Sequence, residues 1–433
     1  MNLVTEAEKA IQTFYHSQNP EERNQAHRWL LELQKSPEAW QTSWLLLDTA
    51  KTVECQYYGA VILHYKISHM INEITEKEIL EIQMKLISLI CVYGSTLKFV
   101  RTKLCSTFAA LVLQNLDNGA TLLGCIEQVG LYLHSVGSES KEITLQIISE
   151  LPSQLNSINM PQSERFKAKD FMMKFVDPLI SMWKEIFLSK NINLQADALP
   201  TMLGWIEFGI PAIDFVPMIP ILLHHIEVDE LSPKICEVIT DALTEPSSYS
   251  LKETIFQMIN QILQLEPLVE RAIIEQNEEF VNNFCMMISN IGETHSNILL
   301  ATNDPSFQKV SLDLIKLILR FSSVSGHFPV DESCSKLTLT FWYHLQDDLY
   351  SIETITDYHR QVYDAFLVLI DIYFLKAQYP PDETYEKFNS EEKEQFRCYR
   401  IDIQDTIMYL NNALRQRCLS YFIEKLTSLL SSE

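Results

Sequence analysis

Apolar residues recur along most of the chain at the spacing of amphipathic helices. In "EKEILEIQMKLISLICVY" (76–93) they follow the i, i+3, i+4, i+7 rule, and "ETIFQMINQILQL" (253–265) repeats the pattern. A stripe of this kind buries one face of a helix and leaves the opposite face in water. The pattern therefore predicts an all-α protein.

Short breaks separate these helical segments. They are marked by Pro, Gly, Ser or Asn, at Asn19-Pro20, Ser36-Pro37, Gly94-Ser95, Asn118-Gly119, Gly137-Ser138, Met160-Pro161, Ile210-Pro211, Glu245-Pro246, Asp304-Pro305 and Tyr379-Pro380-Pro381. A proline placed just after a break suits the first turn of the next helix, where its missing N–H costs nothing.

The breaks are spaced as in a helical repeat protein. Alternate helices are predicted to begin near residues 3, 37, 75, 119, 161, 211, 250, 305 and 352. Their spacing is centred on roughly 40–47 residues, which is typical of helix-pair repeats of the HEAT or armadillo kind. We expect about nine antiparallel HEAT-type helix pairs stacked into an α-solenoid superhelix. Two compact helical domains are the alternative.

The stretch "SKLTLTFWYHLQDDLY" (335–350) combines strand-like alternation, three aromatic residues and two aspartates. In a helical array Leu337, Phe341, Leu345 and Leu349 are four residues apart and form one packing stripe, which Trp342 and Tyr343 widen. The aspartates that follow point away from this stripe. Because adjacent residues on a helix diverge by about 100°, they do not form a paired-carboxylate site. We interpret the stretch as a core helix with an acidic rim.

Composition supports a helical protein and a reducing compartment. Only 10 of the 433 residues are glycine, which disfavours sandwiches, barrels and Rossmann-type sheets. The nine cysteines are scattered and form no CxxC pair, so we expect reduced thiols. The N-terminus does not resemble a signal peptide, and no apolar run approaches 18 residues. We therefore expect no insertion into a membrane.

The charge indicates what kind of partner the chain binds. The formal net charge is −23, and residues 191–310 alone carry 4 Lys/Arg against 17 Asp/Glu, a net −13. Such a surface repels phosphate backbones and attracts basic proteins. Direct binding of nucleic acid is disfavoured and a basic protein partner is favoured.

Motifs that carry chemistry are missing from the sequence. It contains no phosphate-binding glycine loop, no HExxH and no GxSxG. His64 and His69 are five residues apart, and the neighbouring pair His224-His225 diverges around a helix, so neither has metal-ligand spacing. We predict no catalytic residue, no metal and no cofactor. The hypothesis of an enzyme with a buried helical active site is the least favoured one.

Several segments carry a resemblance to a known family. "AHRWLLELQKSPEAWQTSWLLL" (26–47) and "QYYGAVILHYKIS" (56–68) look like the N-terminal module of the importin-β (karyopherin-β) superfamily of nuclear transport receptors. "GETHSNILL" (292–300), the stretch 335–351 and "KAQYPPDETYEKFNSEEKEQFRCYRIDIQDTIMYL" (376–410) belong to the same similarity. Full-length members are about twice as long as this chain, so the resemblance covers only their N-terminal arch.

The resemblance implies a function. Members of the family are HEAT-repeat superhelices that bind the GTPase Ran in its GTP form, dock at FG-repeat nucleoporins and shuttle protein cargo between nucleus and cytoplasm, in the most similar branch in both directions. On this basis residues 1–120 are expected to form the importin N-terminal module, a Ran-binding candidate. Residues 121–433 are expected to form further HEAT repeats, with an exposed acidic loop near 380–395.

The resemblance also suggests contact residues on the inner helices, expected at 21–35, 53–70 and 96–115. The Ran-binding candidates are Gln56, Tyr57, Leu63, Lys66, Lys98 and Arg101, and further along the chain Asp347, Asp348, Glu391, Glu392 and Glu394. Repeat core is the alternative for Leu63 and Tyr57, and a solvated face or an intrahelical ion pair is the alternative for Lys66 and Arg101. For the acids the alternative is a solvated acidic loop.

Two expectations complete the sequence reading. Arg397, Arg400, Asp402 and Asp405 are expected to form a salt-bridge ladder between repeats. The second hypothesis for function is a HEAT-repeat scaffold or adaptor that binds a basic protein without regard to Ran. Dependence of binding on the nucleotide state of Ran separates the two hypotheses.

Overall fold

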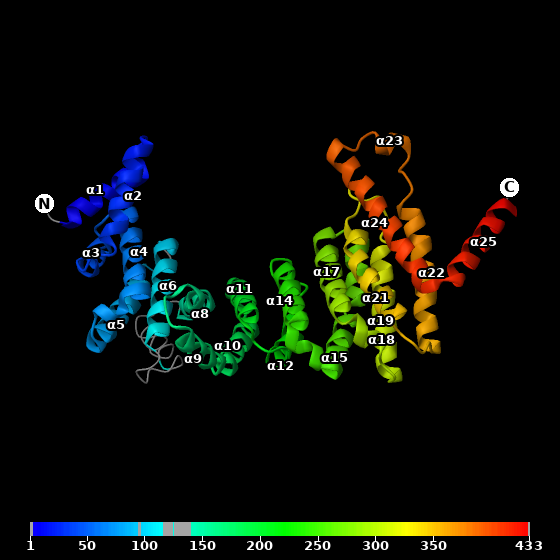
Figure 1. Ribbon diagram of the computed structural model, residues 1–433, viewed down its shortest axis with the longest axis horizontal. Helices are drawn as coiled ribbons and strands as arrows, with labels where there is room; N and C mark the ends of the chain where they lie inside the picture. Colours follow the sequence, from blue (N-terminus) through cyan, green and yellow to red (C-terminus); the bar gives the residue numbers. More distant parts are fainter. Residues whose placement is uncertain (1–2, 94–96, 116–123, 125–139, 432–433) are drawn as a thin grey trace. The chain divides into compact units, whose positions relative to one another are not determined.

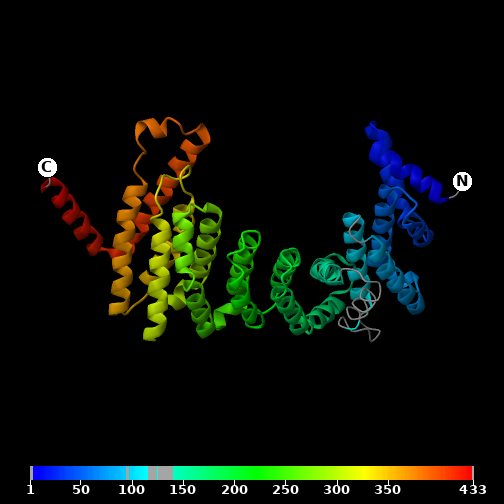
Figure 2. The same cartoon turned by 180° about the vertical axis from the view of Figure 1, so that it is seen from behind.

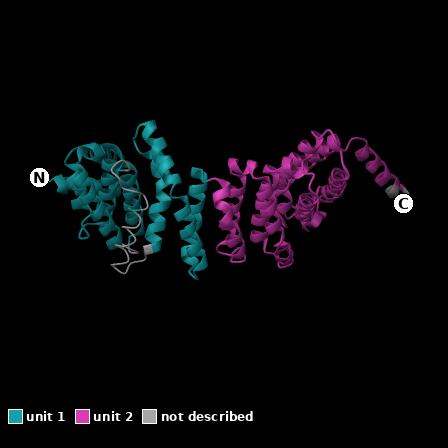
Figure 3. Ribbon diagram, turned by 90° about the horizontal axis from the view of Figure 1, so that it is seen from below, with its two compact units in different colours: residues 1–210 teal, residues 211–433 magenta. Residues whose placement is uncertain are grey.

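A computed structural model of the protein describes residues 3–93, 97–115, 124 and 140–431, and every regular element in these ranges is a helix. The chain divides into two compact units, residues 1–210 and 211–433 (Figure 3). The all-α fold predicted from periodicity is confirmed. The domain boundary expected at residue 120 lies outside the described residues and stays a prediction.

The first unit is built from consecutive helices that lie side by side (Figure 1). Its helices are α1 (Leu3–His16), α2 (Pro20–Leu33), α3 (Ala39–Leu46), α4 (Val53–Met70), the 3-10 turn η1 (Ile71–Glu73), α5 (Glu76–Tyr93), α6 (Lys98–Gln114), α8 (Ser140–Ser157), α9 (Gln162–Met173), α10 (Val176–Leu188) and α11 (Ile192–Phe208). Helices α4, α6, α8 and α11 form a row in which each packs against the next, and α3, α5 and α10 pack against members of this row.

The second unit repeats this two-row arrangement (Figure 2). Its elements are α12 (Ala212–Phe215), η3 (Val216–Met218), α13 (Ile219–His224), α14 (Ser232–Thr244), η4 (Pro246–Ser250), α15 (Lys252–Leu263), α16 (Glu266–Ile274), α17 (Glu278–Thr294), α18 (Ser296–Leu300), α19 (Pro305–Ser322), α20 (Cys334–Leu337), α21 (Leu339–Tyr350), α22 (Asp357–Lys376), α23 (Asp382–Tyr385), α24 (Ser390–Leu414) and α25 (Gln416–Ser431). One row runs through α14, α17, α21 and α24, and the other through α13, α15, α19 and α22. Two rows of antiparallel helices are the architecture of HEAT-type repeats.

The predicted helix starts agree with the structure where they can be compared. The first helices of successive pairs begin at Leu3, Ala39, Glu76, Gln162, Ala212, Lys252, Pro305 and Asp357. The start expected near residue 119 lies outside the described residues. Caps explain several starts: the Asn19 side chain accepts a hydrogen bond from the backbone N–H of Glu21 at 3.0 Å, and Pro20 occupies the first turn.

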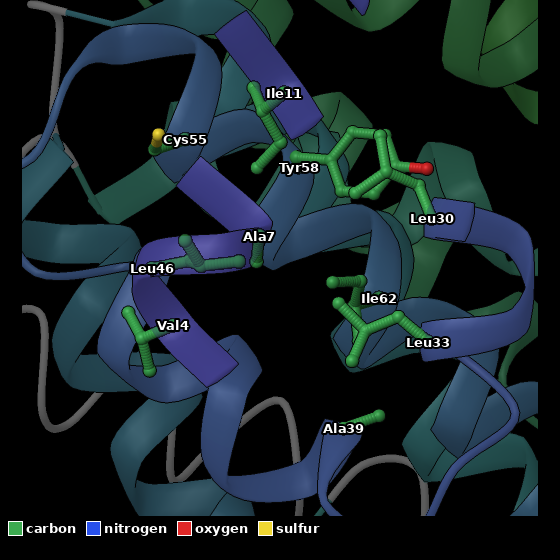
Figure 4. Close-up of a cluster of buried hydrophobic side chains, with 10 residues drawn as sticks. All are labelled: Val4, Ala7, Ile11, Leu30, Leu33, Ala39, Leu46, Cys55, Tyr58 and Ile62. Atoms are coloured by element: carbon green, nitrogen blue, oxygen red, sulfur yellow. The ribbon is translucent and has the colours of Figure 1, made fainter. Parts of the chain in front are cut away.

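The core of the N-terminal pairs shows how the apolar stripes meet. Ten buried side chains from α1 to α4 form one cluster (Figure 4), namely Val4, Ala7, Ile11, Leu30, Leu33, Ala39, Leu46, Cys55, Tyr58 and Ile62. Val4, Ala7 and Ile11 follow the i, i+3, i+7 spacing on α1. Burial raises the pKa of the Tyr58 hydroxyl to about 12, so this phenol stays neutral.

Helix α21 confirms the interpretation for residues 339–350, whereas Leu337, expected in the same stripe, ends the separate short helix α20 and is half-buried. Phe341, Leu345 and Leu349 are fully buried, as is Trp342, whose indole N–H donates to Ser322 Oγ at 3.0 Å. Tyr343 is 42% exposed, so it leaves the core and reaches the surface. The stretch is a core helix with a polar rim.

The acidic segment near 380–395 differs from the expected loop. Helix α24 begins at Ser390, so the acids that follow lie in its first turns. The Asn389 side chain accepts hydrogen bonds from the backbone N–H groups of Glu391 and Glu392, and the Glu392 carboxylate accepts from the N–H of Asn389 at 2.7 Å. This reciprocal capping box starts α24 at Ser390, within the segment that was expected to be a loop after the double proline.

The expected salt-bridge ladder is also wrong for the two arginines. Arg397 pairs with Glu394 of its own helix at 2.6 Å. Arg400 donates to the carbonyl of Ala377 at 2.8 Å and stacks on the ring of Tyr379, with 4.3 Å between the guanidinium carbon and the ring centroid. These contacts tie α24 to the preceding connection. No ion pair of Arg397 or Arg400 in the described part of the chain joins two repeats.

No helix in the described ranges is long and apolar enough to span a bilayer.

Candidate functional site

Two candidates on α4 hold the N-terminal module together instead of facing a partner. Leu63 is fully buried, and Gln56 is only 3% exposed. The Gln56 amide donates to the carbonyls of Thr49 at 3.2 Å and Lys51 at 2.9 Å, so it fixes the loop between α3 and α4. Both side chains belong to the repeat core, the alternative that the sequence left open for Leu63.

Lys66 is fully buried, which neither sequence alternative anticipated. Its ammonium group donates to the Ser36 carbonyl at 3.2 Å and forms an ion pair with Glu73. The Trp40 indole N–H donates to the same carboxylate at 2.9 Å. These two hydrogen bonds, the one from Lys66 first, hold the pKa of Glu73 below its usual range. The partner lies in η1 after the helix, so Lys66 clamps the end of α4.

Tyr57 lies at an aromatic surface on α4 and α6. It is half-buried, and its ring centroid lies 5.6 Å from that of Phe99, which is 48% exposed. Tyr15 on α1 is 44% exposed. Its pKa is raised by burial and by the neighbouring Tyr57 and Glu54. The three rings form what we call the aromatic surface, defined by Tyr15, Tyr57 and Phe99.

The structure brings Lys98 and Arg101 together at one cavity. Both line a space of about 610 Å³ formed by α6, α8 and α11. Lys98 is exposed, whereas Arg101 is only 7% exposed. Arg101 therefore reaches solvent or a partner mainly through this cavity.

The adjacent aspartates on α21 have different surroundings. Asp348 is half-buried and accepts a hydrogen bond from the Ser296 hydroxyl. Asp347 is exposed, and its carboxylate makes no hydrogen bond or ion pair with the described residues. It lines a cavity of about 710 Å³ between α21 and α24. In the same cavity the rings of Tyr343 and Tyr409 meet edge to face with their centroids 4.9 Å apart.

The acids at the start of α24 differ in the hydrogen-bond and ion-pair partners of their carboxylates. Glu392 closes the capping box, and the hydrogen bond and charge of Arg397 hold the pKa of Glu394 below its usual range. Glu391 is exposed and accepts only from the Gln395 amide at 3.3 Å. Tyr409 lies 18 residues further along the same helix, about 27 Å at 1.5 Å per residue. The structure therefore separates these acids from Asp347, whose cavity includes Tyr409.

His64 makes structural contacts inside the first unit. His64 is hydrogen-bonded to the Gln154 amide oxygen at 2.8 Å, and Gln154 donates to Ser106 Oγ at 2.8 Å, which links α4, α6 and α8. Burial, and to a lesser extent the charge of Lys103, lowers the pKa of His64 to about 4. No group of three or more His, Cys, Asp or Glu side chains that could hold a metal ion occurs among residues that the structure describes.

Sequence reasoning missed two features of these sites. Phe99 follows Lys98 directly, and only its 48% exposure distinguishes it from a core residue. Arg101 lies in the run "FVRTKLCSTFAALVLQ" (99–114), which carries only two cations, Arg101 and Lys103, among mostly apolar residues, and a cation in such a run is the signal that could have singled it out.

Comparisons with known proteins match two regions, which contain the candidates on α4 and at the start of α24 but not those on α6 and α21. The importin-beta N-terminal domain matches residues 26–92, and the importin 13 repeat matches residues 378–417. Importin-13 of Homo sapiens is 31% identical over 437 residues, which cover 99% of this chain and 45% of that protein. The chain is a homologue of importin-13 over the part of that protein that it spans, and it contains an importin-beta N-terminal domain. The segments 26–47, 56–68 and 376–410, which carried the resemblance, overlap the matched regions, so the resemblance is confirmed.

More distant relatives and solved structures agree. Importin-13 homolog A of Dictyostelium discoideum is 20% identical, over 98% of this chain and 43% of its own length. The structure of importin-13 in its cytosolic state superposes with a TM-score of 0.71 at 22% identity, over 88% of this chain and 44% of that one. Kap121p bound to Nup53p gives a TM-score of 0.53 at 12% identity, over 99% and 38%. Both support the HEAT-type fold, and the chain spans about 45% of the length of importin-13.

Proposed function

We propose that the chain acts as a nuclear transport receptor that binds Ran in its GTP form and carries protein cargo through nuclear pores. One observation carries the proposal: an importin-beta N-terminal domain and an importin 13 repeat both match a chain that is 31% identical to importin-13 over 99% of its length. Such a receptor contacts FG-repeat nucleoporins and shuttles between nucleus and cytoplasm.

The N-terminal contact with Ran is proposed at the aromatic surface. Tyr57 and Phe99 are accessible on neighbouring helices, and Lys98 next to them is exposed. Aromatic side chains with one accessible face contribute strongly to protein interfaces. Gln56, Leu63 and Lys66 are assigned instead to the framework that holds this surface, because they are buried.

The second contact is proposed at Asp347. Its carboxylate is exposed, has no partner among the described residues and borders the cavity between α21 and α24. Arg415 lines the same cavity without an ion pair to Asp347, so this carboxylate is open to a basic side chain of Ran or of cargo. Glu391 is a separate candidate contact. It lies about 27 Å along α24 from Tyr409, which lines the Asp347 cavity, so only a partner that spans this distance reaches both. Kap121p, a structural neighbour, has been solved with Pho4p, with Ulp1p and with Nup53p, which supports cargo and nucleoporin binding by this fold.

The mechanism proposed is linkage between binding sites. If Ran·GTP and cargo engage one arch, each changes the affinity of the other by the same factor. The chain supplies no phosphate loop, so the nucleotide is held and hydrolysed by Ran. The charge of −23 favours the encounter with basic partners.

The experiment is a pull-down of the chain with GTP-locked and with GDP-loaded Ran. We expect retention of the GTP form only. Asp347→Lys is expected to weaken retention of Ran or of cargo, whereas Asp229→Lys, the same charge change at an exposed position between α13 and α14, leaves it unchanged. Equal retention of both nucleotide states, or of neither, would favour the Ran-independent scaffold.

A further inference from the structure

The cavity between α6, α8 and α11 contains a buried cation without a partner. Arg101 is 7% exposed, and its Nε is buried and makes no hydrogen bond. No hydrogen bond or ion pair of the Arg101 guanidinium is found among the residues that the structure describes, and Nε is the one nitrogen of the group that is both fully buried and unpartnered. Glu142 and Asp197 line the same cavity, and Asp197 forms no ion pair with Arg101 among the described residues.

The unpaired guanidinium in this position is suited to an outside partner that enters the cavity. Arginine keeps its charge at every physiological pH, so burial does not neutralise it. Removing a charge from water without a counter-charge destabilises the free protein. Lys98 lines the same cavity and adds a second positive charge at an exposed position. The two cations together favour an oxyanion.

A second polar group in the cavity, the side-chain amide of Gln146, restricts the class of ligand that fits there. The Gln146 amide donates to Thr102 Oγ1 at 2.5 Å, and its oxygen is buried without a partner. The Thr102 hydroxyl donates in turn to the Lys98 carbonyl at 2.9 Å, which fixes the direction of the amide. The cavity thus combines an unpaired donor with an unpaired acceptor. An acidic residue in a peptide supplies both complements, a carboxylate and a backbone N–H.

The acids of the cavity argue against a polyanion. Asp197 is exposed and Glu142 is half-buried, so a nucleic acid or a run of acidic residues meets like charges there. One carboxylate at Arg101, followed by a neutral or basic residue, avoids this repulsion. The volume of about 610 Å³ is large enough for a few residues of a peptide.

We propose that Arg101 and Lys98 form a binding site for a single acidic side chain of a protein partner, with Gln146 accepting a hydrogen bond from the partner's backbone. The chain as a whole is acidic and attracts basic partners, whereas this site binds an acidic side chain. It goes beyond Ran binding, because it concerns an acidic anchor whichever protein supplies it.

The test uses two capped tripeptides at constant ionic strength, acetyl-Ala-Glu-Ala-amide and its glutamine counterpart. We expect the glutamate peptide to raise the melting temperature of the chain and to shift the Nε–Hε NMR resonance of Arg101, and the glutamine peptide to do neither. Lys98→Glu is expected to weaken binding about tenfold. Lys77→Glu, the same change at an exposed position on α5, is expected to leave it unchanged.

Removal of Arg101 separates a binding role from a packing role. Arg101→Met is expected to lose the peptide response yet to melt at the same or a higher temperature in the absence of peptide, because a buried unpaired charge is gone. Arg23→Met at an exposed position is its control. A lower melting temperature for Arg101→Met, no resonance shift with the glutamate peptide, or an equal response to the glutamine peptide or to inorganic phosphate would overturn the proposal. None of these results depends on Ran.

Discussion

The ammonium nitrogen of Lys376 lies 2.9 Å from a carboxylate oxygen of Glu332, and both side chains are buried. Lys376 also donates to the carbonyl of Gly326 at 3.1 Å, so it holds the connection after α19 against the end of α22. Glu332 accepts from the Ser335 hydroxyl at 2.6 Å, which in turn lies 2.6 Å from the Tyr399 hydroxyl on α24. One buried ion pair therefore joins three helices of the second unit.

Loss of one partner of this pair is expected to be costly. Lys376→Met or Glu332→Gln should lower the free energy of unfolding by about 3–5 kcal/mol, because each leaves a buried group without its counterpart. The double variant should cost less than the sum. Urea denaturation followed by circular dichroism measures these differences. Lys316→Met, in the exposed pair with Asp313, is the control and should change stability by less than about 1 kcal/mol.

Two helical glycines are expected to respond in opposite directions to alanine. A Cβ on Gly59 would lie 2.8 Å from the Ser43 carbonyl, because α3 and α4 approach closely there, whereas one on Gly204 in α11 would meet nothing within 4 Å. Gly59→Ala should destabilise the chain by about 1–3 kcal/mol. Gly204→Ala should stabilise it by roughly 0.5–1 kcal/mol. Thermal melting of both variants checks this, and a stabilising Gly59→Ala would contradict the packing of α3 on α4.

The first unit should lose stability in mild acid. The folded-state pKa of His64 is about 4, below its ordinary value near 6.5, because burial disfavours the charged ring. A depressed pKa means that the unfolded chain binds the proton first, so stability falls as the pH drops from about 6.5 to about 4. The loss from this residue is on the order of 3 kcal/mol at most. Urea melts at pH 7, 6 and 5 should show a smaller pH dependence for His64→Gln than for the parent, and an identical dependence would contradict the assignment.

The aromatic surface should contribute to Ran binding without contributing to stability. Phe99→Ala is expected to weaken binding of Ran·GTP about tenfold or more, as for an interface anchor. Its melting temperature should change little, because the ring is 48% exposed. Phe166→Ala, which removes a 63% exposed ring from α9, is the matched control and should leave Ran binding unchanged. Equal effects of the two variants would remove the aromatic surface from the proposed interface.

The spacing of apolar residues and the breaks between helical segments were sufficient to predict most of the fold. The helix expected over 53–70 is α4 (Val53–Met70), and the one expected over 96–115 is α6 (Lys98–Gln114), because one-sided apolar stripes and proline breaks are local properties of the sequence. The start of α24 was not predicted. The double proline favoured a loop over residues 380–395, whereas the capping box at Asn389 starts a helix within that range.

The candidate sites were harder to predict, because burial depends on partners far along the chain. Lys66 has the composition of a surface residue, yet Glu73 and the Ser36 carbonyl enclose its charge. Asp347 and Asp348 are neighbours in sequence, and only Ser296 on α18 distinguishes them. Such contacts cannot be read from spacing within one helix.

The most direct test of the central claim is a titration of the chain with Ran loaded with a non-hydrolysable GTP analogue and with GDP, followed by isothermal calorimetry. The account predicts that the GTP form binds at least about tenfold more tightly, equivalent to 1.4 kcal/mol, and that the affinity falls as salt is added. Equal affinities for the two forms, or no binding of either, would contradict it.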